Sequence, residues 1–314
     1  MASKPGVPGA TRWPWLDGLR GIALVAMAIY HFTWDLAYFH FVPGGVLRST
    51  LFTVFGHAIA CSFLAIAGFA LAIAAQPQLD LTKFLVRLAK IVIAALLVTV
   101  ATWFAFPQSF VTFGILHCIA AASVISLAFM LAPFWLTGLA GALVFIAGWV
   151  IELPAFDTVN GWLGLGVRVP LTNDWRPLFP WAGAMLLGLG FGQWVLNRKM
   201  FVRAMPPPAR LLQTAGRHSL IIYLLHQPLL FAMVWLAALA IQPQADANIP
   251  QGNYIRACIT RCEQTGSDPG FCARACNCIA QETLRTDIWK HVVRNNLTPV
   301  LQKQYDGIIA ACRR

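Results

Sequence analysis

Long apolar runs constrain this chain more than any other feature of its sequence. A helix needs about 20 mostly apolar residues to cross the hydrocarbon core of a bilayer, and several stretches reach that length. Gly and Pro interrupt some of these runs, which membrane helices tolerate. We therefore predict an all-α fold, a polytopic membrane helix bundle of about seven transmembrane helices. The expected spans are residues 16–40, 50–75, 86–106, 110–131, 134–152, 178–197 and 219–241.

The composition argues against a water-soluble globular domain. Only 11% of the 314 residues are charged, whereas soluble domains have about 25%. The net charge of +11 at pH 7 is compatible with nucleic-acid binding. However, the basic residues stand in connections between apolar runs, which is the pattern that orients membrane proteins. We therefore expect membrane lipid as a partner and no nucleic acid.

The positions of Lys and Arg predict an orientation. Cytoplasmic connections of membrane proteins carry an excess of these residues. An odd number of spans with a cytoplasmic N-terminus places the C-terminal tail in the periplasm of a bacterial inner membrane. The basic connections are the N-terminus with Lys4 and Arg12, the loop after the second span with Lys83, Arg87 and Lys90, and the loop Arg198–Arg217 before the seventh span.

Six of the eight cysteines lie after residue 257 and predict a small helical domain, residues 250–314. The transmembrane domain is expected to comprise residues 1–245. Two pairs of cysteines have members four residues apart, which puts each pair on one helical face, and a turn separates the pairs. Two short helices joined in this way can be stapled by Cys258–Cys276 and Cys262–Cys272, with Cys278–Cys312 as a third bridge.

Other connectivities of the six cysteines remain open, and a zinc site is the alternative interpretation. The spacing, the even number of cysteines and the small core favour disulfides, which small domains commonly need for stability. Disulfides persist in the periplasm and not in the cytosol, which agrees with the orientation predicted from the basic residues. No metal is expected.

The first span carries four ionisable groups, which are costly inside a membrane and are functional candidates. At 100° per residue, Arg20 and His31 fall on nearly the same side of the helix. Asp17 and Asp35 lie close to that side, so the four groups form one stripe about 27 Å long. Such a stripe must face a polar cavity or other helices. A structural ion pair between helices is the alternative interpretation.

Asp35 lies one turn after His31 in the sequence. A carboxylate in that position can orient the imidazole and raise its basicity, which is how a general base or a nucleophilic histidine is supported. We therefore predict that His31, Asp35 and Arg20 are catalytic residues.

Two further polar groups stand near the ends of other spans. His57 and His117, which begin the second and fourth spans, lie near the outer side together with Asp174 and Arg176. Ser219, Tyr223 and His226 share one side of the seventh span, at the depth of Arg20. The alternatives are buried, hydrogen-bonded histidines in the first group and interhelical hydrogen bonds in the second. Two polar groups at different depths, joined by one stripe, suit the transfer of a chemical group across a membrane.

The motifs resemble those of membrane acyltransferases. An Arg followed after ten residues by a His, as in Arg20 and His31, is typical of the acyltransferase type-three group. The chain more closely resembles the bacterial branch of the heparan-α-glucosaminide N-acetyltransferase catalytic family. The segments that carry this resemblance are residues 16–36, 113–117, 174–181 and 216–228, from Leu16-Asp17-Gly18-Leu19-Arg20 to His226-Gln227-Pro228.

The resemblance implies an acyl-CoA-dependent O- or N-acyltransferase with acetyl-CoA as the expected donor. The acceptor is expected to be an amine or hydroxyl of an extracytoplasmic sugar. Arg20 and His31 match the family's Arg and His. On this hypothesis Asp17, Arg217, Ser219, Tyr223 and His226 bind the donor, and His57, His117, Asp174 and Arg176 form the acceptor side.

Two other classes of function stay open. A transporter or flippase also has charged stripes and Gly-rich spans. A haem protein is the second alternative, because His57 and His117 lie at similar depth on different spans and are candidate axial ligands. The sequence does not distinguish an acyl-histidine intermediate from direct transfer, and it does not predict the oligomeric state.

Overall fold

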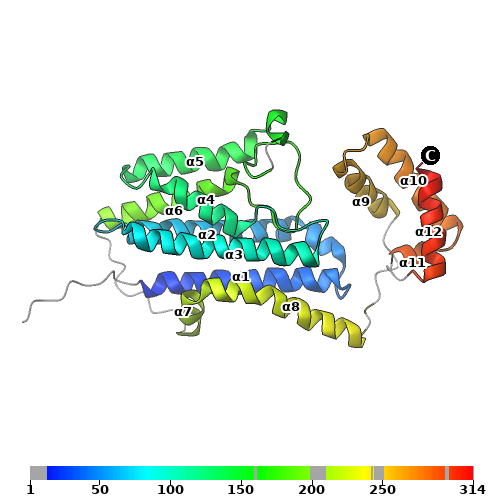
Figure 1. Ribbon diagram of the computed structural model, residues 1–314, viewed down its shortest axis with the longest axis horizontal. Helices are drawn as coiled ribbons and strands as arrows, with labels where there is room; N and C mark the ends of the chain where they lie inside the picture. The colour runs from blue at the N-terminus through cyan, green and yellow to red at the C-terminus, as the bar shows by residue number, and fades with distance from the viewer. Residues whose placement is uncertain are drawn as a thin grey trace, which may run out of the picture. The chain divides into compact units, whose positions relative to one another are not determined.

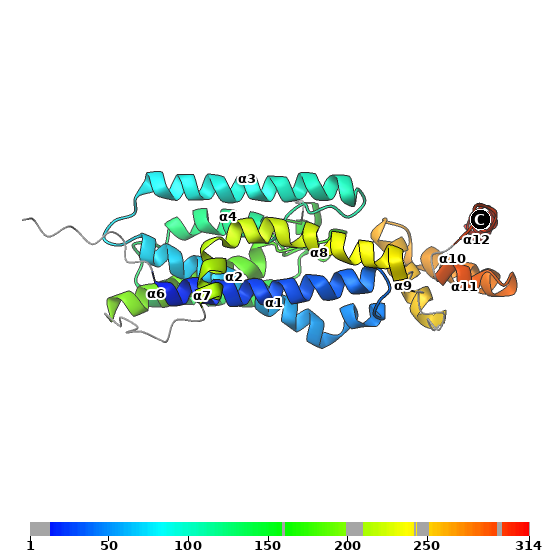
Figure 2. The same ribbon diagram turned by 90° about the horizontal axis from the view of Figure 1, so that it is seen from below.

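The computed structural model of the protein describes residues 13–158, 161–198, 210–241, 243, 251–293 and 297–313. The regular structure of these ranges is helical, apart from one isolated bridge between Phe113 and Trp175. The first eight α-helices are α1 (Pro14–Tyr38), α2 (Thr50–Ala74), α3 (Leu81–Ala105), α4 (Ile115–Leu127), α5 (Phe134–Val150), α6 (Leu178–Asn197), α7 (Arg210–Arg217) and α8 (Ser219–Ile241). Helices α2 to α6 run side by side along roughly one direction (Figures 1 and 2).

Each expected span coincides with a helix, but the helices differ in their ability to cross a membrane. Helices α2, α3, α6 and α8 are long and apolar enough to do so. Helices α4 and α5 are apolar but shorter, with 13 and 17 residues. Helix α1 has 25 residues and carries the four ionisable groups. The protein is therefore an all-helical membrane protein with several membrane-capable helices.

Helix α3 begins five residues earlier than expected because Asp80 caps it. The Asp80 carboxylate accepts a hydrogen bond from the backbone N–H of Lys83 at 3.0 Å, as N-cap residues do. This bond holds the pKa of the Asp80 carboxyl below its usual value. Lys83, Arg87 and Lys90 consequently lie on the helix itself, and the expectation that they form a loop is wrong.

Helix α4 is much shorter than the expected span 110–131. At about 1.5 Å per residue, its 13 residues cover about 20 Å. The preceding segment is extended instead, and it pairs with the segment before α6. The backbone N–H of Asn173 donates to the carbonyl of Ser109 at 2.9 Å, and that of Arg176 donates to the carbonyl of Phe113 at 3.0 Å. The backbone polar groups that a helix would have satisfied find partners in this pairing.

Helix α6 is the most buried of the long apolar helices and packs against α2, α4 and α5. Glycines allow its close approach to α2. A Cβ on Gly68 of α2 would overlap the backbone oxygen of Met185, and a Cβ on Gly188 of α6 would overlap that of Ala65. Small residues at such contacts are typical of membrane helices, because they let the backbones approach. The main cluster of buried apolar side chains lies between these helices and includes Leu64, Leu71, Met185 and Leu189.

The chain divides into two compact units. The first contains residues 1–31 and 50–229, and the second contains residues 32–49 and 230–314. The second unit therefore includes the ends of α1 and α8, where the ring of Phe231 lies 4.9 Å from that of Phe39. The predicted domain boundary between residues 245 and 250 lies outside the described residues, as do Lys4, Arg12, Lys199 and Arg203.

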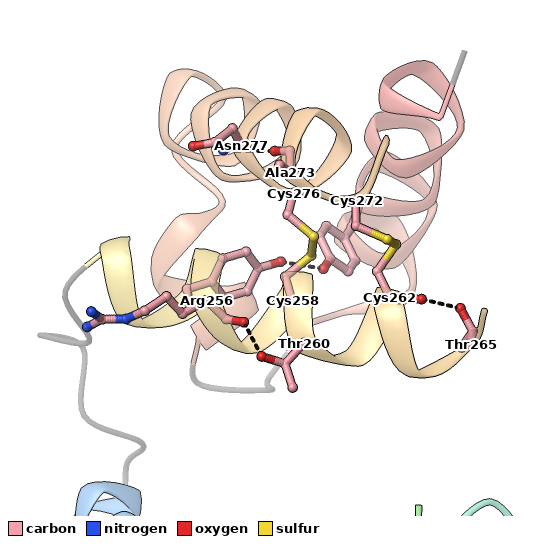
Figure 3. Close-up of a disulfide and its surroundings, with 11 residues drawn as sticks. Arg256, Cys258, Thr260, Cys262, Thr265, Cys272, Ala273, Cys276 and Asn277 are labelled. Carbon is pink, nitrogen blue, oxygen red and sulfur yellow. Dashed lines mark hydrogen bonds between the residues drawn. A yellow bond between two sulfur atoms is a disulfide. The ribbon is translucent and has the colours of Figure 1, made fainter. Parts of the chain in front are cut away.

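The C-terminal region is a group of four helices held by three disulfides. The helices are α9 (Gln251–Gln264), α10 (Pro269–Arg285), α11 (Trp289–Val293) and α12 (Pro299–Cys312). The bonds Cys258–Cys276 and Cys262–Cys272 join α9 to α10 (Figure 3), and Cys278–Cys312 joins α10 to α12. The first two bonds staple the two helices as expected, and the third is the expected bridge between Cys278 and Cys312.

The small core of this region lies next to the disulfides. Cys272 and Cys276 are buried, and Ile279, Ile288 and Ile308 form an apolar cluster. Tyr254 packs against this cluster, and its hydroxyl lies 2.9 Å from that of Tyr305. Burial and this hydrogen bond raise the pKa of the Tyr254 phenol above its ordinary value.

Candidate functional site

The two faces of α1 differ in polarity. The exposed face is entirely apolar, since its large side chains recur every three or four residues and are each at least 39% exposed. These are Leu19, Ile22, Val25, Ile29 and Phe32. The ionisable groups lie on the other side: Asp17 and Asp35 are buried, and Arg20 and His31 are half-buried. The predicted stripe therefore faces protein, as the cost of charge in lipid requires.

Asp17 is the centre of a charge cluster at the start of α1. Its carboxylate Oδ1 lies 3.0 Å from Nη1 of Arg20, and its Oδ2 lies 3.6 Å from Nε of Arg217 on α7. The Asp17 side chain is only 3% exposed, whereas Arg217 is 45% exposed. The buried carboxylate thus holds two guanidinium groups, one of which reaches the surface.

Two glycines bring α7 against α1 and so position Arg217. A Cβ on Gly216 would overlap the backbone oxygen of Asp17, and a Cβ on Gly21 would overlap the backbone oxygen of Leu212. The two backbones therefore touch on either side of the ion pairs. The sequence placed Arg217 in a long basic loop, but a short helix fixes it here.

Arg87 adds a third guanidinium to this cluster. It is half-buried on α3, and its charge interacts with that of Arg20. Arg20 and Arg217 pair with Asp17, and Arg87 lies within electrostatic range of Arg20, so the cluster has an excess of positive charge. Ser219 follows directly as the first residue of α8, where it is half-buried.

The paired segments, residues 109–113 and 173–176, hold Asp174 and Arg176 half-buried beside α4. Asp174 belongs to the segment before α6, and its side chain reaches the start of α4. There its Oδ2 accepts a hydrogen bond from the backbone N–H of Ile115 at 2.9 Å. Gly114 makes room for it, because a Cβ there would come within 2.5 Å of that oxygen. The carboxylate therefore satisfies one of the free N–H groups of the helix terminus and interacts well with the helix dipole.

Arg176 lies over the indole ring of Trp181. Its guanidinium carbon is 5.1 Å from the centre of the Trp181 ring, and its Nη1 donates to the carbonyl of Trp175 at 2.8 Å. Asp174 is its ion-pair partner at 3.7 Å. Arg176 lies close enough to His31 on α1 and to His57 on α2 for its charge to affect both.

His57 also packs against the ring of Trp181. Its ring is half-buried, 5.3 Å from the ring of Trp181 and 5.4 Å from that of Trp149. The structure therefore brings His57, Asp174 and Arg176 together through Trp181 and the paired segments. This agrees with their grouping in the sequence analysis.

His117 is held by hydrogen bonds at both ring nitrogens. Nδ1 accepts from the backbone N–H of Gly114 at 3.2 Å, and Nε2 lies 3.3 Å from the Thr99 hydroxyl. Since that hydroxyl donates to the carbonyl of Val111 at 2.8 Å, it accepts from Nε2–H. The ring is therefore neutral and fixed between α3 and α4, and these bonds favour a positioning role.

His226 lies against His31. The two rings are 5.0 Å apart, so the expectation that His226 lies at the depth of Arg20 is wrong. That expectation counted residues from the start of the seventh span, but the packing of α8 on α1 decides the depth. Tyr223, one turn earlier, contacts three clusters of the bundle core, and Arg176 and Asp174 act on it electrostatically.

Comparison with known families gives a clear match. Residues 12–228 match a family model described as the catalytic region of heparan-alpha-glucosaminide N-acetyltransferase. The chain belongs to this family. No curated protein and no solved structure matched the chain in the other two comparisons.

The heparan-alpha-glucosaminide N-acetyltransferase family implies membrane acetyltransferase activity in general and acetyl-CoA as its donor. The matched range begins just before α1 and ends within α8, so it contains all the polar groups described above. It excludes the disulfide-bonded helices α9 to α12.

Three residues of the site escaped the sequence analysis as site residues. Arg87 had served only to orient the chain, although it already lay within the expected third span, residues 86–106. Trp181 had no individual signal beyond its place in a motif of the family. Thr99 carried no signal at all, because its role depends on the packing of α3 against α4.

Proposed function

We propose that this protein transfers an acyl group, acetyl in the first place, from cytosolic acyl-CoA to an amine or hydroxyl of an extracytoplasmic sugar. The family supports acetyl transfer at a membrane. One observation carries the rest: the ionisable side of α1 faces protein and has arginines at one end and the His31–His226 pair farther along.

The arginine cluster suits the donor. Coenzyme A carries several phosphate charges, and the planar guanidinium group can donate parallel hydrogen bonds to phosphate oxygens. Arg217 is the exposed member of the cluster and makes the first contact, while Arg20 and Arg87 lie deeper. The negative charge of Asp17 reduces the repulsion between Arg20 and Arg217, with which it pairs. Ser219 and Tyr223 line the donor path along α8.

His31 is the reacting group next to the donor in this proposal. It either accepts the acyl group from the thioester or takes the proton of the acceptor. Asp35, fully buried one turn farther along α1, supports the imidazole. Both residues belong to the continuous helix α1, so their order along the chain fixes their spacing.

The acceptor side consists of His57 and of the paired segments, residues 109–113 and 173–176, which carry Asp174 and Arg176. His57 and Arg176 are half-buried and offer hydrogen-bond donors to the sugar. The Trp181 ring is only 3% exposed, so it holds these two side chains in place and does not itself contact the acceptor. Asp174 and His117 hold the backbone that presents them. In this orientation the N-terminus is cytoplasmic, and α9 to α12 lie in the periplasm of a bacterial inner membrane.

Purified protein in lipid nanodiscs tests the proposal. It is incubated with acetyl-CoA and either glucosamine, which offers an amine, or N-acetylglucosamine, which offers hydroxyls. Mass spectrometry then follows free CoA and the acetylated sugar. We expect acetyl transfer by the wild type and loss of at least 100-fold in His31→Ala, on the scale of a lost acid–base or nucleophilic group.

The donor site has its own test. Arg217→Ala should raise the KM for acetyl-CoA several-fold with kcat nearly unchanged. Arg168→Ala is the matched control, because this arginine is 83% exposed on the surface and pairs only loosely with Asp157. Full activity of His31→Ala, or transport of the sugar without acetyl transfer in proteoliposomes, would contradict the proposal. In cells, a deletion strain should lose acyl groups from envelope sugars.

A further inference from the structure

The hydrogen bonding of His226 fixes which of its nitrogens carries the proton. Nδ1 lies 2.6 Å from the backbone carbonyl oxygen of Tyr223. A carbonyl oxygen only accepts hydrogen bonds, so Nδ1 carries the hydrogen. In the neutral imidazole the other nitrogen, Nε2, then holds a lone pair and is a base.

That lone pair is buried and unused within the described part of the chain. Nε2 of His226 is inaccessible to solvent and accepts no hydrogen bond from any described residue. Buried polar atoms in native proteins nearly always have partners, so an exception calls for a functional explanation. A nitrogen that receives a proton during a reaction is one such explanation.

The neighbours of His226 place it in the reaction centre. The ring of His31 on α1 is 5.0 Å away, and the ring of Tyr223 on its own helix is 5.7 Å away. Pro228 follows within the same turn of α8. A proline inside a helix has no backbone N–H to donate, so α8 lacks one backbone hydrogen bond in the turn that holds the His226 ring.

We propose that His226 is a second catalytic histidine and that its Nε2 is the general base of acyl transfer. This inference rests on the proposed function. The acceptor oxygen or nitrogen forms a bond to the thioester carbonyl carbon while Nε2 takes its proton. The carbon–sulfur bond breaks, and the departing thiolate takes the proton from His226 and leaves as CoA thiol. His226 ends the cycle neutral.

The same base serves a route through an acyl-histidine. A ring nitrogen of His31 first attacks the thioester carbonyl carbon, the carbon–sulfur bond breaks, and Nε2 of His226 passes the His31 ring proton to the departing thiolate, which leaves as CoA thiol. The acceptor then attacks the acyl group on His31, and Nε2 of His226 takes the acceptor proton. The bond between the acyl carbon and the His31 nitrogen breaks, and His226 returns the proton to that nitrogen. In both routes His226 takes the acceptor proton, so this inference assigns to His226 the proton transfer that the proposed function left open for His31, and His31 interacts with the acyl group.

Kinetics of two substitutions test this assignment. His226→Gln keeps a hydrogen-bonding side chain without a base, and His226→Ala leaves space for added imidazole. We expect kcat to fall 10²- to 10⁴-fold in both, the usual contribution of a general base. The KM for acetyl-CoA should change less than three-fold. Imidazole should restore part of the activity of His226→Ala but not that of His226→Gln.

His218→Ala is the matched control. Nδ1 of His218 also bonds a backbone carbonyl, that of Thr214 at 3.0 Å, but its ring is exposed. We expect this variant to keep wild-type kcat. A His226→Gln variant with wild-type kcat would overturn the role of His226 while leaving the proposed function intact. A wild type that transfers no acetyl group would overturn the proposed function itself.

The protonation state has a readout that does not depend on activity. Nitrogen NMR of the histidine-labelled protein distinguishes protonated from unprotonated ring nitrogens, and the signals lost in His226→Gln belong to His226. We expect a protonated Nδ1 and an unprotonated Nε2 at neutral pH. A hydrogen on Nε2 in the resting protein would overturn the assignment, whatever the kinetics.

Discussion

Replacing Gly216 by alanine tests whether the contact between α1 and α7 builds the donor site. The added Cβ would overlap the backbone oxygen of Asp17. Neither backbone can rotate away as a side chain does, so α7 must move outward. That movement lengthens the pair between Arg217 and Asp17, whose atoms are 3.6 Å apart.

Two opposing contributions set the size of the effect on stability. Overpacking of a close contact costs about 1–3 kcal/mol. Alanine in a helix recovers at most about 1 kcal/mol relative to glycine. We therefore expect a net loss of about 1–2 kcal/mol in the free energy of unfolding. An ion pair with a partly exposed partner contributes at most about 1 kcal/mol, so the KM for acetyl-CoA should rise about two- to five-fold.

Gly138→Ala is the matched control. Gly138 also lies on a helix of the bundle, α5, but a Cβ there meets no atom within 4 Å. Melting of both variants in nanodiscs, followed by acetyl-CoA saturation curves, separates the two effects. Gly216→Ala should melt several degrees below Gly138→Ala and have the higher KM. Equal melting temperatures and equal KM values would refute the reasoning.

Three further predictions concern other parts of the protein. Asp174→Ala should lower the free energy of unfolding by about 1–2 kcal/mol, because the N–H of Ile115 loses its cap, and thermal melting measures the loss. Cys258→Ser with Cys276→Ser opens a loop with a sequence separation of 18, which by chain entropy costs about 3 kcal/mol. Limited proteolysis should then cleave α9 under conditions that spare the wild type. The raised pKa of Tyr254 means that the folded state retains the phenolic proton. Its contribution to stability is complete below a pH of about 10 and is lost as the pH rises beyond that value. A wild-type melting temperature that falls no faster than that of Tyr254→Phe above this pH would show this to be wrong.

Much of the architecture follows from patterns along the chain. The apolar runs locate seven helices because their length matches the bilayer, and the polar side of α1 follows from helical periodicity alone. The cysteine spacing favours the disulfide pairs that the structure has, since members four residues apart lie on one side of a helix, but other connectivities stayed open. The helices and the polar side of α1 depend on distances within one helix, which the sequence determines.

The errors have local causes that a search for apolar runs overlooks. Asp80 extends α3 backward through a single capping hydrogen bond, and hydropathy is insensitive to such bonds. Helix α4 is shorter than the expected span 110–131 because the residues before it pair with a segment about 60 residues later in the chain. Apolar composition does not distinguish a membrane helix from an extended segment whose backbone is satisfied by a distant partner.

The sequence by itself determined which residues of α1 must avoid lipid, because the helix repeat and the cost of charge in hydrocarbon leave no alternative. Only the tertiary structure decided what those residues meet. Glycine contacts place Arg217 beside Asp17, a pairing of extended segments holds Arg176 beside α4, and the packing of α8 sets His226 against His31. Each of these contacts joins segments far apart in the sequence, and the close packing of backbones fixes their depth.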